Sequence, residues 1–227
     1  LRTEDGYELP ADVAVRDPLE EDNVSGRLSI DYNPTDDLLV YGSFSVGYKS
    51  GAWPLLTAAT TNQLDAASQE RLDALELGTK ITLLEGRAQL NTSAFYYWYE
   101  DKQLLSEVED PVFTTLPRLV NIPESNGYGA EVDLDVILTE ALSGRFSVAY
   151  TESEVEGYTG FRRRGQRDDF TGDEFPYTPE LQLSSFLRYE RSIADGYSAA
   201  SSLSVSYQSE SSSTIGREEG FDIKSYT

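Results

Sequence analysis

The sequence predicts an all-β protein: an antiparallel transmembrane β-barrel, of which this chain forms a partial barrel of about eight or nine strands. Three observations predict it, namely two-residue alternation of apolar and polar residues, segments of a dozen residues, and connections that are alternately short and long. Side chains on a strand point to opposite faces in turn, so each segment has one apolar and one polar face. Strands of soluble proteins usually have about 5 or 6 residues, whereas a tilted membrane strand needs about 9 to 11.

Residues 1–23 are acidic and without periodicity, and we expect them to form a loop that leads into the barrel portion at residues 24–227. They lack the basic start and apolar core of a signal peptide. The first predicted strands cover residues 24–32 and 38–49, because Leu38, Val40 and Phe44 share one face while Tyr41 and Ser43 share the other. Pro and Asp residues at 33–37 favour a tight turn between them.

Three further hairpins are predicted, with a ninth strand beginning near Phe221. Their strands cover 75–83 and 87–99, 127–136 and 146–150, and 181–189 and 202–208. Short turns alternate with long connections, as periplasmic turns alternate with extracellular loops in outer-membrane barrels. This rule predicts outer loops near 50–70, 103–119, 157–177 and 211–222.

The alternation predicts which side chains face lipid and which face a watered lumen. On the polar face, burying Glu131, Asp133 and Asp135 in an apolar core would cost many kcal/mol, so we place them in a solvated interior rather than in a catalytic pair. The predicted lipid-facing set is Leu38, Val40, Phe44, Val46, Leu77, Ile81, Leu90, Val132, Leu134, Phe146, Val148, Leu183, Leu187, Leu203 and Val205.

Composition excludes several functions. The 227 residues include no Cys, Met or His, so thiol nucleophiles, Cys/His zinc sites and imidazole bases cannot be built, and we predict no enzyme, catalytic residue, metal site or cofactor. The net charge of −22 argues against nucleic acid as a partner, since its phosphates require a basic surface. Two interpretations of the acidic loops stay open, solvated loops or divalent cation binding beside lipopolysaccharide.

Five sequence pieces, in this order and spacing, resemble the barrel of TonB-dependent outer-membrane receptors over roughly residues 21–227. They are 40–51 (VYGSFSVGYKSG), 75–80 (LELGTK), 91–99 (NTSAFYYWY), Asn121 followed by 127–132 (GYGAEV), and 175–180 (FPYTPE). The resemblance implies a barrel of about 22 strands in the Gram-negative outer membrane, filled by an N-terminal plug. It also implies uptake of a scarce nutrient, typically a ferric siderophore, driven by the TonB complex, with outer-membrane lipid and lipopolysaccharide as surroundings.

The chain departs from this family pattern in its strand number, and no plug, TonB box or closing strand with a terminal aromatic residue is found in it. We therefore expect an internal or C-terminal portion of a longer receptor, whose coupling residues would lie in the plug. Two other functions stay open. A passive porin would need neither plug nor TonB, and a surface-binding structural barrel would hold a partner on its loops.

The candidate ligand-binding residues are a basic cluster in a predicted outer loop, together with Trp53 in another. The basic cluster comprises Arg162, Arg163, Arg164 and Arg167. Guanidinium forks suit carboxylates, catecholates and phosphates, so we expect the cluster to attract an anionic ligand. The alternatives are pairing with the neighbouring Asp168 and Asp169 or contact with lipopolysaccharide phosphates.

Overall fold

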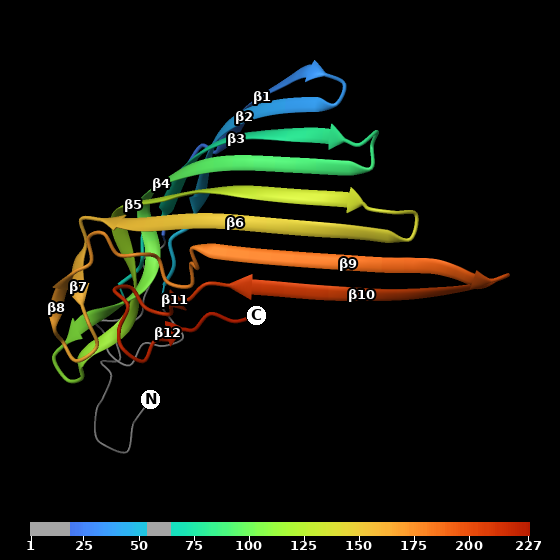
Figure 1. The fold of residues 1–227 in the computed structure, drawn as a ribbon. Coiled ribbons are helices and arrows are strands. Elements are labelled where there is room, and N and C mark those ends of the chain that lie inside the picture. The colour runs from blue at the N-terminus through green and yellow to red at the C-terminus, as the bar shows by residue number, and fades with distance from the viewer. Residues whose placement is uncertain (1–18, 54–64) are drawn as a thin grey trace.

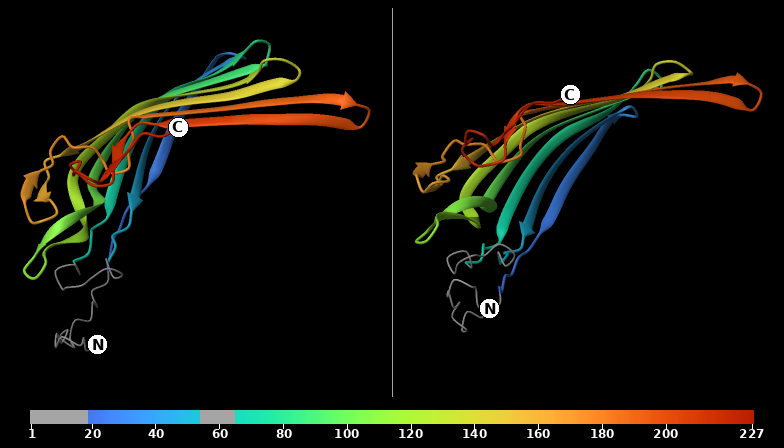
Figure 2. Two further views of the ribbon diagram at one scale, coloured as in Figure 1. Left: turned by 60° about the horizontal axis from the view of Figure 1, so that its bottom comes forward. Right: turned by 90° about the horizontal axis from the view of Figure 1, so that it is seen from below.

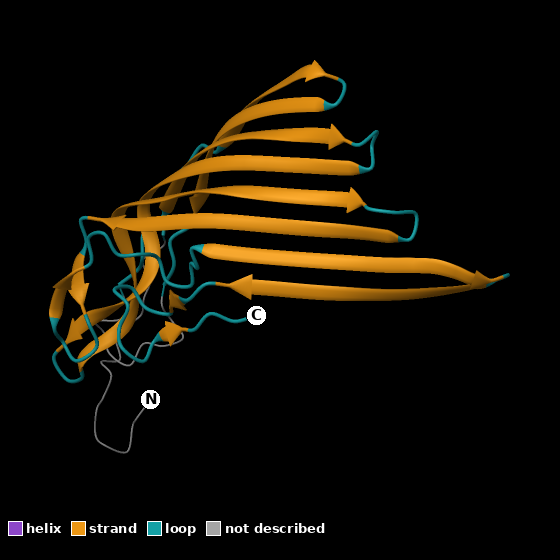
Figure 3. Cartoon of the chain, in the orientation of Figure 1, coloured by secondary structure: helices purple, strands orange, loops and turns teal. Residues whose placement is uncertain are grey.

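A computed structural model describes residues 19–53 and 65–227, and every regular element in that part is a strand (Figures 1 and 3). No helix of the described residues is long and apolar enough to cross a membrane. Eight long strands form the body of the sheet: β1 (Gly26–Thr35), β2 (Leu38–Lys49), β3 (Glu70–Leu83), β4 (Ala88–Asp110), β5 (Thr114–Ile137), β6 (Leu142–Glu156), β9 (Leu181–Ala194) and β10 (Tyr197–Gln208). Four short strands lie in the connections: β7 (Thr159–Phe161), β8 (Arg167–Asp169), β11 (Ser211–Ser212) and β12 (Asp222–Ile223).

The long strands follow one another in chain order across the sheet, β1-β2-β3-β4-β5-β6-β9-β10, and every neighbouring pair is antiparallel. Short turns join the strands at one end, where Leu84, Glu85 and Gly86 take positive φ angles of 54°, 57° and 86° between β3 and β4. The long connections gather at the opposite end of the curved, open sheet (Figure 2). The predicted fold class, a partial antiparallel barrel with alternating short turns and long loops, is confirmed.

The prediction of a loop at 103–119 is wrong, because β4 and β5 continue as a paired hairpin far beyond their neighbours. The register runs without interruption from Gln103↔Asn121 to Asp110↔Thr114. In this extension, hereafter the β4–β5 arm, the two strands satisfy each other's backbone hydrogen bonds. The two faces of the arm contact loops and solvent, and neither face contacts lipid or the lumen. The arm therefore lacks the two-residue alternation that marks the membrane strands.

The prediction of a ninth barrel strand near Phe221 is also corrected. Residues 222–223 form β12, which pairs with β11 inside a long connection and not with β10. The bridge next to β10 forms later, between Gln208 and Tyr226. The acidic segment 1–23 lies mostly outside the described residues, and the described residues 19–25 form no strand.

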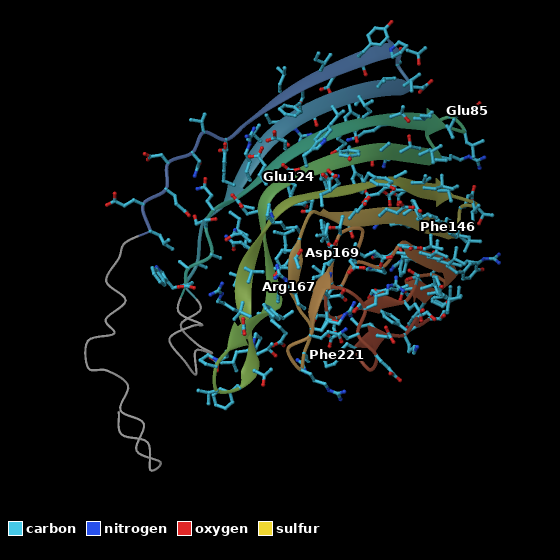
Figure 4. All side chains as sticks on the ribbon, turned by 90° about the vertical axis from the view of Figure 1, so that its left-hand side faces the viewer. Glu85, Glu124, Phe146, Arg167, Asp169 and Phe221 are labelled. Atoms are coloured by element: carbon cyan, nitrogen blue, oxygen red, sulfur yellow. The ribbon has the colours of Figure 1, made fainter. Side chains whose placement is uncertain are left out.

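One face of the sheet, here the outer face, carries cross-strand rows of exposed apolar side chains. Its residues Val40, Leu77, Val132 and Leu203 are 37%, 58%, 41% and 59% exposed. One row crosses five strands with apolar or aromatic side chains and ends in a carboxylate on the sixth, Leu28↔Phe44↔Leu75↔Tyr96↔Tyr128↔Glu152. All residues of the predicted lipid-facing set belong to this face by register, and Figure 4 shows Phe146 on the outside of the curve. A soluble monomer rarely exposes so large an apolar surface.

The opposite, inner face is polar, and two of its glycines, Gly78 and Gly129, are covered by rings from the neighbouring strand. Tyr41 is paired with Gly78, and a Cβ added to Gly78 would lie 2.5 Å from the Tyr41 ring. Phe95 is paired with Gly129, where a Cβ would lie 2.8 Å from the ring and 2.1 Å from the carbonyl oxygen of Tyr150. These close approaches explain why only glycine fits beside the aromatic residues.

The predicted row of inner carboxylates is also present on this face. Asp133 accepts a hydrogen bond from the Ser147 hydroxyl at 2.5 Å, and Asp135 pairs with Arg145 at 2.6 Å. Asp133 and Asp135 therefore each have a polar partner, and Glu131 is exposed, so the row avoids the cost of burying an unpaired carboxylate.

Candidate ligand-binding loops

The connections at the open end share a small hydrophobic core of their own. Its buried members come from β5, β6 and the two connections that follow β8 and β11: Val120, Ile122, Val155, Phe170, Phe175 and Ile215. Side chains from Tyr99, Leu104, Val108 and Tyr158 pack around it. The β4–β5 arm, the connection that carries β7 and β8, and the connection that carries β11 and β12 are thus held as one unit (Figure 2).

A half-buried lysine connects this unit to the sheet. The ammonium of Lys102 lies 3.5 Å from the centre of the Tyr99 ring and 4.6 Å from that of Phe175, and it pairs with Glu70 at 3.8 Å. Burial lowers the pKa of Lys102, and the nearby Glu70 carboxylate partly opposes that shift. Cation–π contacts gain strength when they are desolvated, so this contact fixes Phe175 against the inner face.

The connection between β6 and β9 carries two carboxylates, Asp169 and Asp173, whose pKa values shift in opposite directions. Burial raises the pKa of Asp173, although Arg162 acts in the other direction. Hydrogen bonds from the hydroxyl and backbone N–H of Thr171 hold the pKa of Asp169 below its usual value. Both groups lie near the basic cluster in the chain, but neither of them is the carboxylate that pairs with it.

The structure divides the basic cluster into paired and unpaired arginines. Arg162 donates to Asp168 at 2.5 Å and to the carbonyl oxygen of Gly216 at 2.7 Å, and its guanidinium lies 5.5 Å from the centre of the Phe170 ring. It therefore joins the β7–β8 hairpin to the following long connection. This role agrees with the alternative of pairing to Asp168.

Arg163 has a comparable joining role. Its side chain lies 3.5 Å from a carboxylate oxygen of Glu107, and its guanidinium lies 4.3 Å from the centre of the Phe221 ring. Its backbone N–H donates to Glu218 at 3.1 Å. Glu107 also pairs with Phe161 in the β4–β7 register, so the hairpin is attached to the β4–β5 arm.

Arg164 and Arg167 are exposed, and within the described residues neither forms an ion pair. Arg164 lies at the tip of the β7–β8 hairpin with a φ angle of 82°. Arg167 and Asp169 lie on the concave side of the curved sheet in Figure 4. These two arginines are therefore the members of the basic cluster that stay exposed and without an ion pair in the described part of the chain.

Trp53 lies on a different connection, next to Ala52, which bridges Ala67. It is half-buried, and the residues that follow it at 54–64 lie outside the described part of the chain. Within that part, the structure does not bring Trp53 into contact with the basic cluster.

A cavity of about 540 Å³ opens between the β4–β5 arm and β7. Its lining includes Glu107, Arg118, Asn121 and Tyr158, and Arg118 pairs with Asp65 at 2.6 Å. Sequence reasoning missed this cavity because it did not predict the arm that forms one wall. Among the described residues, no group of three or more acidic side chains is placed to hold a metal ion.

The family model described as "TonB dependent receptor-like, beta-barrel" matches residues 3–227. The chain belongs to this receptor family. The match confirms the resemblance found in the sequence, and the family is one of receptors rather than enzymes. A search of curated proteins finds no match.

Solved structures with the same fold support the assignment of this TonB-dependent receptor barrel. The ferric yersiniabactin uptake receptor FyuA from Yersinia pestis has a TM-score of 0.70 and 19% identity, over 91% of this chain. The siderophore receptor PiuA and the ferric preacinetobactin receptor BauA, both from Acinetobacter baumannii, have TM-scores of 0.64 and 0.62 at 18% and 17% identity, each over 89% of this chain. The chain spans only 28% of the length of each of the three.

Proposed function

We propose that the chain is part of a Gram-negative outer-membrane receptor for TonB-dependent uptake of a ferric siderophore. The family match over residues 3–227 carries this proposal. Among the structures that share the fold, PiuA is named a siderophore receptor, FyuA a ferric yersiniabactin uptake receptor and BauA a ferric preacinetobactin receptor. The TonB complex is the proposed energy source, acting through a plug domain.

The outer face supports the proposed location in the outer membrane. Aromatic side chains mark its upper boundary, where the Tyr96 and Tyr128 rings stack with centres 5.8 Å apart and Trp98 lies beside them. The hydroxyls of Tyr128 and Tyr150 donate to Glu152, as befits a boundary between lipid and water. Lipid on the apolar rows and lipopolysaccharide above them are the partners that this arrangement favours.

The loop unit supports the proposed ligand site. We propose Arg164 and Arg167 as ligand contacts, with Trp53 as a further candidate, while Arg162 and Arg163 keep the hairpin in place. The division into a leading loop at 1–23 and a barrel portion at 24–227 also remains a prediction.

Uptake of a radiolabelled ferric siderophore by cells that carry the whole receptor tests the proposal. Cells with an intact TonB complex should accumulate iron, and cells that lack TonB should not. Uptake that is independent of TonB would favour a passive porin. Binding to the cell surface without uptake in either strain would favour a surface-binding structural barrel.

A further inference from the structure

One row of residues interrupts five neighbouring strands where the sheet meets the loop unit. By extension of the register, the row runs Lys49, Glu70, Asp101, Pro123 and Gly157. Strand β2 ends at this row, β3 begins at it, and β6 ends one residue before it. Asp101 and Gly157 have positive φ angles of 53° and 67°, and Pro123 has no N–H to donate. The pairing of β4 with β5 is therefore broken at the row and resumes only in the β4–β5 arm.

The left-handed backbone at Asp101 turns the next residue to the other face of the sheet. Even-numbered residues of β4 lie on the outer face up to this point, so a continued alternation would point Lys102 outward. Its ammonium instead lies over the Tyr99 ring and beside Glu70, on the inner side. The arm thus leaves the sheet in a new orientation, and Figure 1 shows β4 and β5 bending away from the line of the other strands.

Two amide side chains of the arm hold the described ends of the β2–β3 connection on the far side of the row. The Gln103 amide donates to the carbonyl oxygens of Ser50 and Ser68, both at 2.9 Å, and so closes the base of the connection. Asn121, paired with Gln103 in the register, donates to the Ser68 carbonyl oxygen at 3.0 Å and accepts the Ser68 N–H at 2.8 Å. The β7–β8 hairpin, which follows Gly157, is paired with the arm as well. The arm, the β2–β3 connection and this hairpin therefore form one body beyond the row.

The start of β3 is joined to this body by the buried carboxylate of Glu70. The carboxylate accepts the backbone N–H of Gln103 at 2.8 Å and lies 3.8 Å from the ammonium of Lys102. The body also rests on the sheet through the apolar loop core, to which the arm contributes Ile122 and the sheet contributes Val155. Apolar contacts are non-directional and permit packed elements to slide, whereas the contacts of Glu70 are made in one orientation only.

We infer that the row is a hinge, and that Glu70 and Lys102 are the latch that keeps the body beyond it in the orientation of this structure. Rotation at the row disrupts no pair of the β4–β5 register, because Asp101 and Pro123 are not paired with each other. The paired strands on either side stay rigid. Release of the latch lets the body swing and changes how far it covers the open end of the sheet. This device does not depend on which solute the receptor transports.

Pulsed electron paramagnetic resonance on the whole receptor in lipid nanodiscs tests the hinge, in a background without other cysteines. Nitroxide labels at Val112→Cys on the tip of the arm and at Asp36→Cys in the β1–β2 turn measure a distance across the row. Lys102→Met should raise the share of a second, shifted distance about fivefold, since an ion pair and a cation–π contact are lost. Lys224→Met is the matched control, because it breaks a lysine–glutamate pair of 3.9 Å away from the row and should leave the distances unchanged.

Amide hydrogen exchange in Lys102→Met separates a swing of the body from unfolding of the arm. The Gln103 N–H should exchange about fivefold faster, whereas the paired residues of the arm and the Ser68 N–H should keep their rates. Adding Pro123→Val to Lys102→Met gives the row a new N–H donor and should return the distances to those of the receptor with Lys102 intact.

An unchanged distance distribution in Lys102→Met would overturn the hinge. Equal acceleration of exchange along the whole arm would overturn it as well, because the strands would then be separating. Faster exchange at Ser68 would refute the joint movement of the arm and the β2–β3 connection. A second distance that persists after Pro123→Val would refute the part played by the interrupted pairing.

Discussion

Replacing Val132 with arginine tests whether the outer face contacts lipid. Val132 pairs with Val148, which in turn pairs with Leu183. At about 3.3 Å per residue, Tyr128 lies about 13 Å from Val132 along one direction of the strands, and Tyr189 lies about 20 Å away along the other. For strands tilted by about 40°, the total of about 33 Å becomes a belt about 25 Å tall, which is the expected height of the apolar band.

Val132 therefore lies close to the middle of the belt. An arginine at the midplane of a transmembrane barrel destabilises it by about 2–4 kcal/mol, because its guanidinium must be moved into the hydrocarbon or must thin the bilayer. Asp133→Asn changes the next residue, which faces inward and accepts a hydrogen bond from the Ser147 hydroxyl. Since an amide oxygen can accept the same hydrogen bond, that variant should change the unfolding free energy little.

The measurement is urea unfolding of the whole receptor in lipid vesicles, followed by tryptophan fluorescence. Tyr189→Arg provides a depth control, because near the interface an arginine should cost only about 0–1 kcal/mol. Equal decreases in unfolding free energy for Val132→Arg and Asp133→Asn would refute the assignment of the two faces. Equal decreases for Val132→Arg and Tyr189→Arg would refute the calculated position of the belt.

Three further outcomes are expected. Gly129→Ala should lower the unfolding free energy by about 1–3 kcal/mol, because the added Cβ would clash with a ring and a carbonyl oxygen. Gly47→Ala is the control, since a Cβ at Gly47 would meet open space and the variant should be neutral or more stable. Equal urea midpoints for the two variants would contradict this prediction. Arg162→Gln should speed amide hydrogen exchange in β7, β8 and the residues around Gly216, because the contact that joins the two connections is lost. Arg164→Gln is the control and should leave the exchange rates unchanged. Equal exchange rates in the two variants would argue against the role of Arg162 in joining the connections. The raised pKa of Asp173 means that the folded loop gains stability as the pH falls through this folded pKa and is less stable above it. Asp173→Asn should therefore slow exchange in the loop at neutral pH but not at acidic pH, and an identical effect at both pH values would contradict the assignment.

The sequence alone determined the fold class, the two faces and most of the membrane strands. Alternation is a local property, since every second side chain of a strand points the same way whatever its partner strands are. The row of Glu131, Asp133 and Asp135 on the polar face could thus be placed without any tertiary information, and the register confirms it.

Only the tertiary structure decided which arginines of the basic cluster join the loops together and which stay exposed. Arg162 and Gly216 lie far apart in the sequence, as do Arg163 and Glu107, so no local pattern reveals these contacts. The β4–β5 arm was missed for a related reason. Its strands satisfy their hydrogen bonds with each other and face no lipid, so the alternation that depends on a boundary between lipid and water is lost there. The contact between Gly165 and Thr114 likewise exists only once both hairpins have folded.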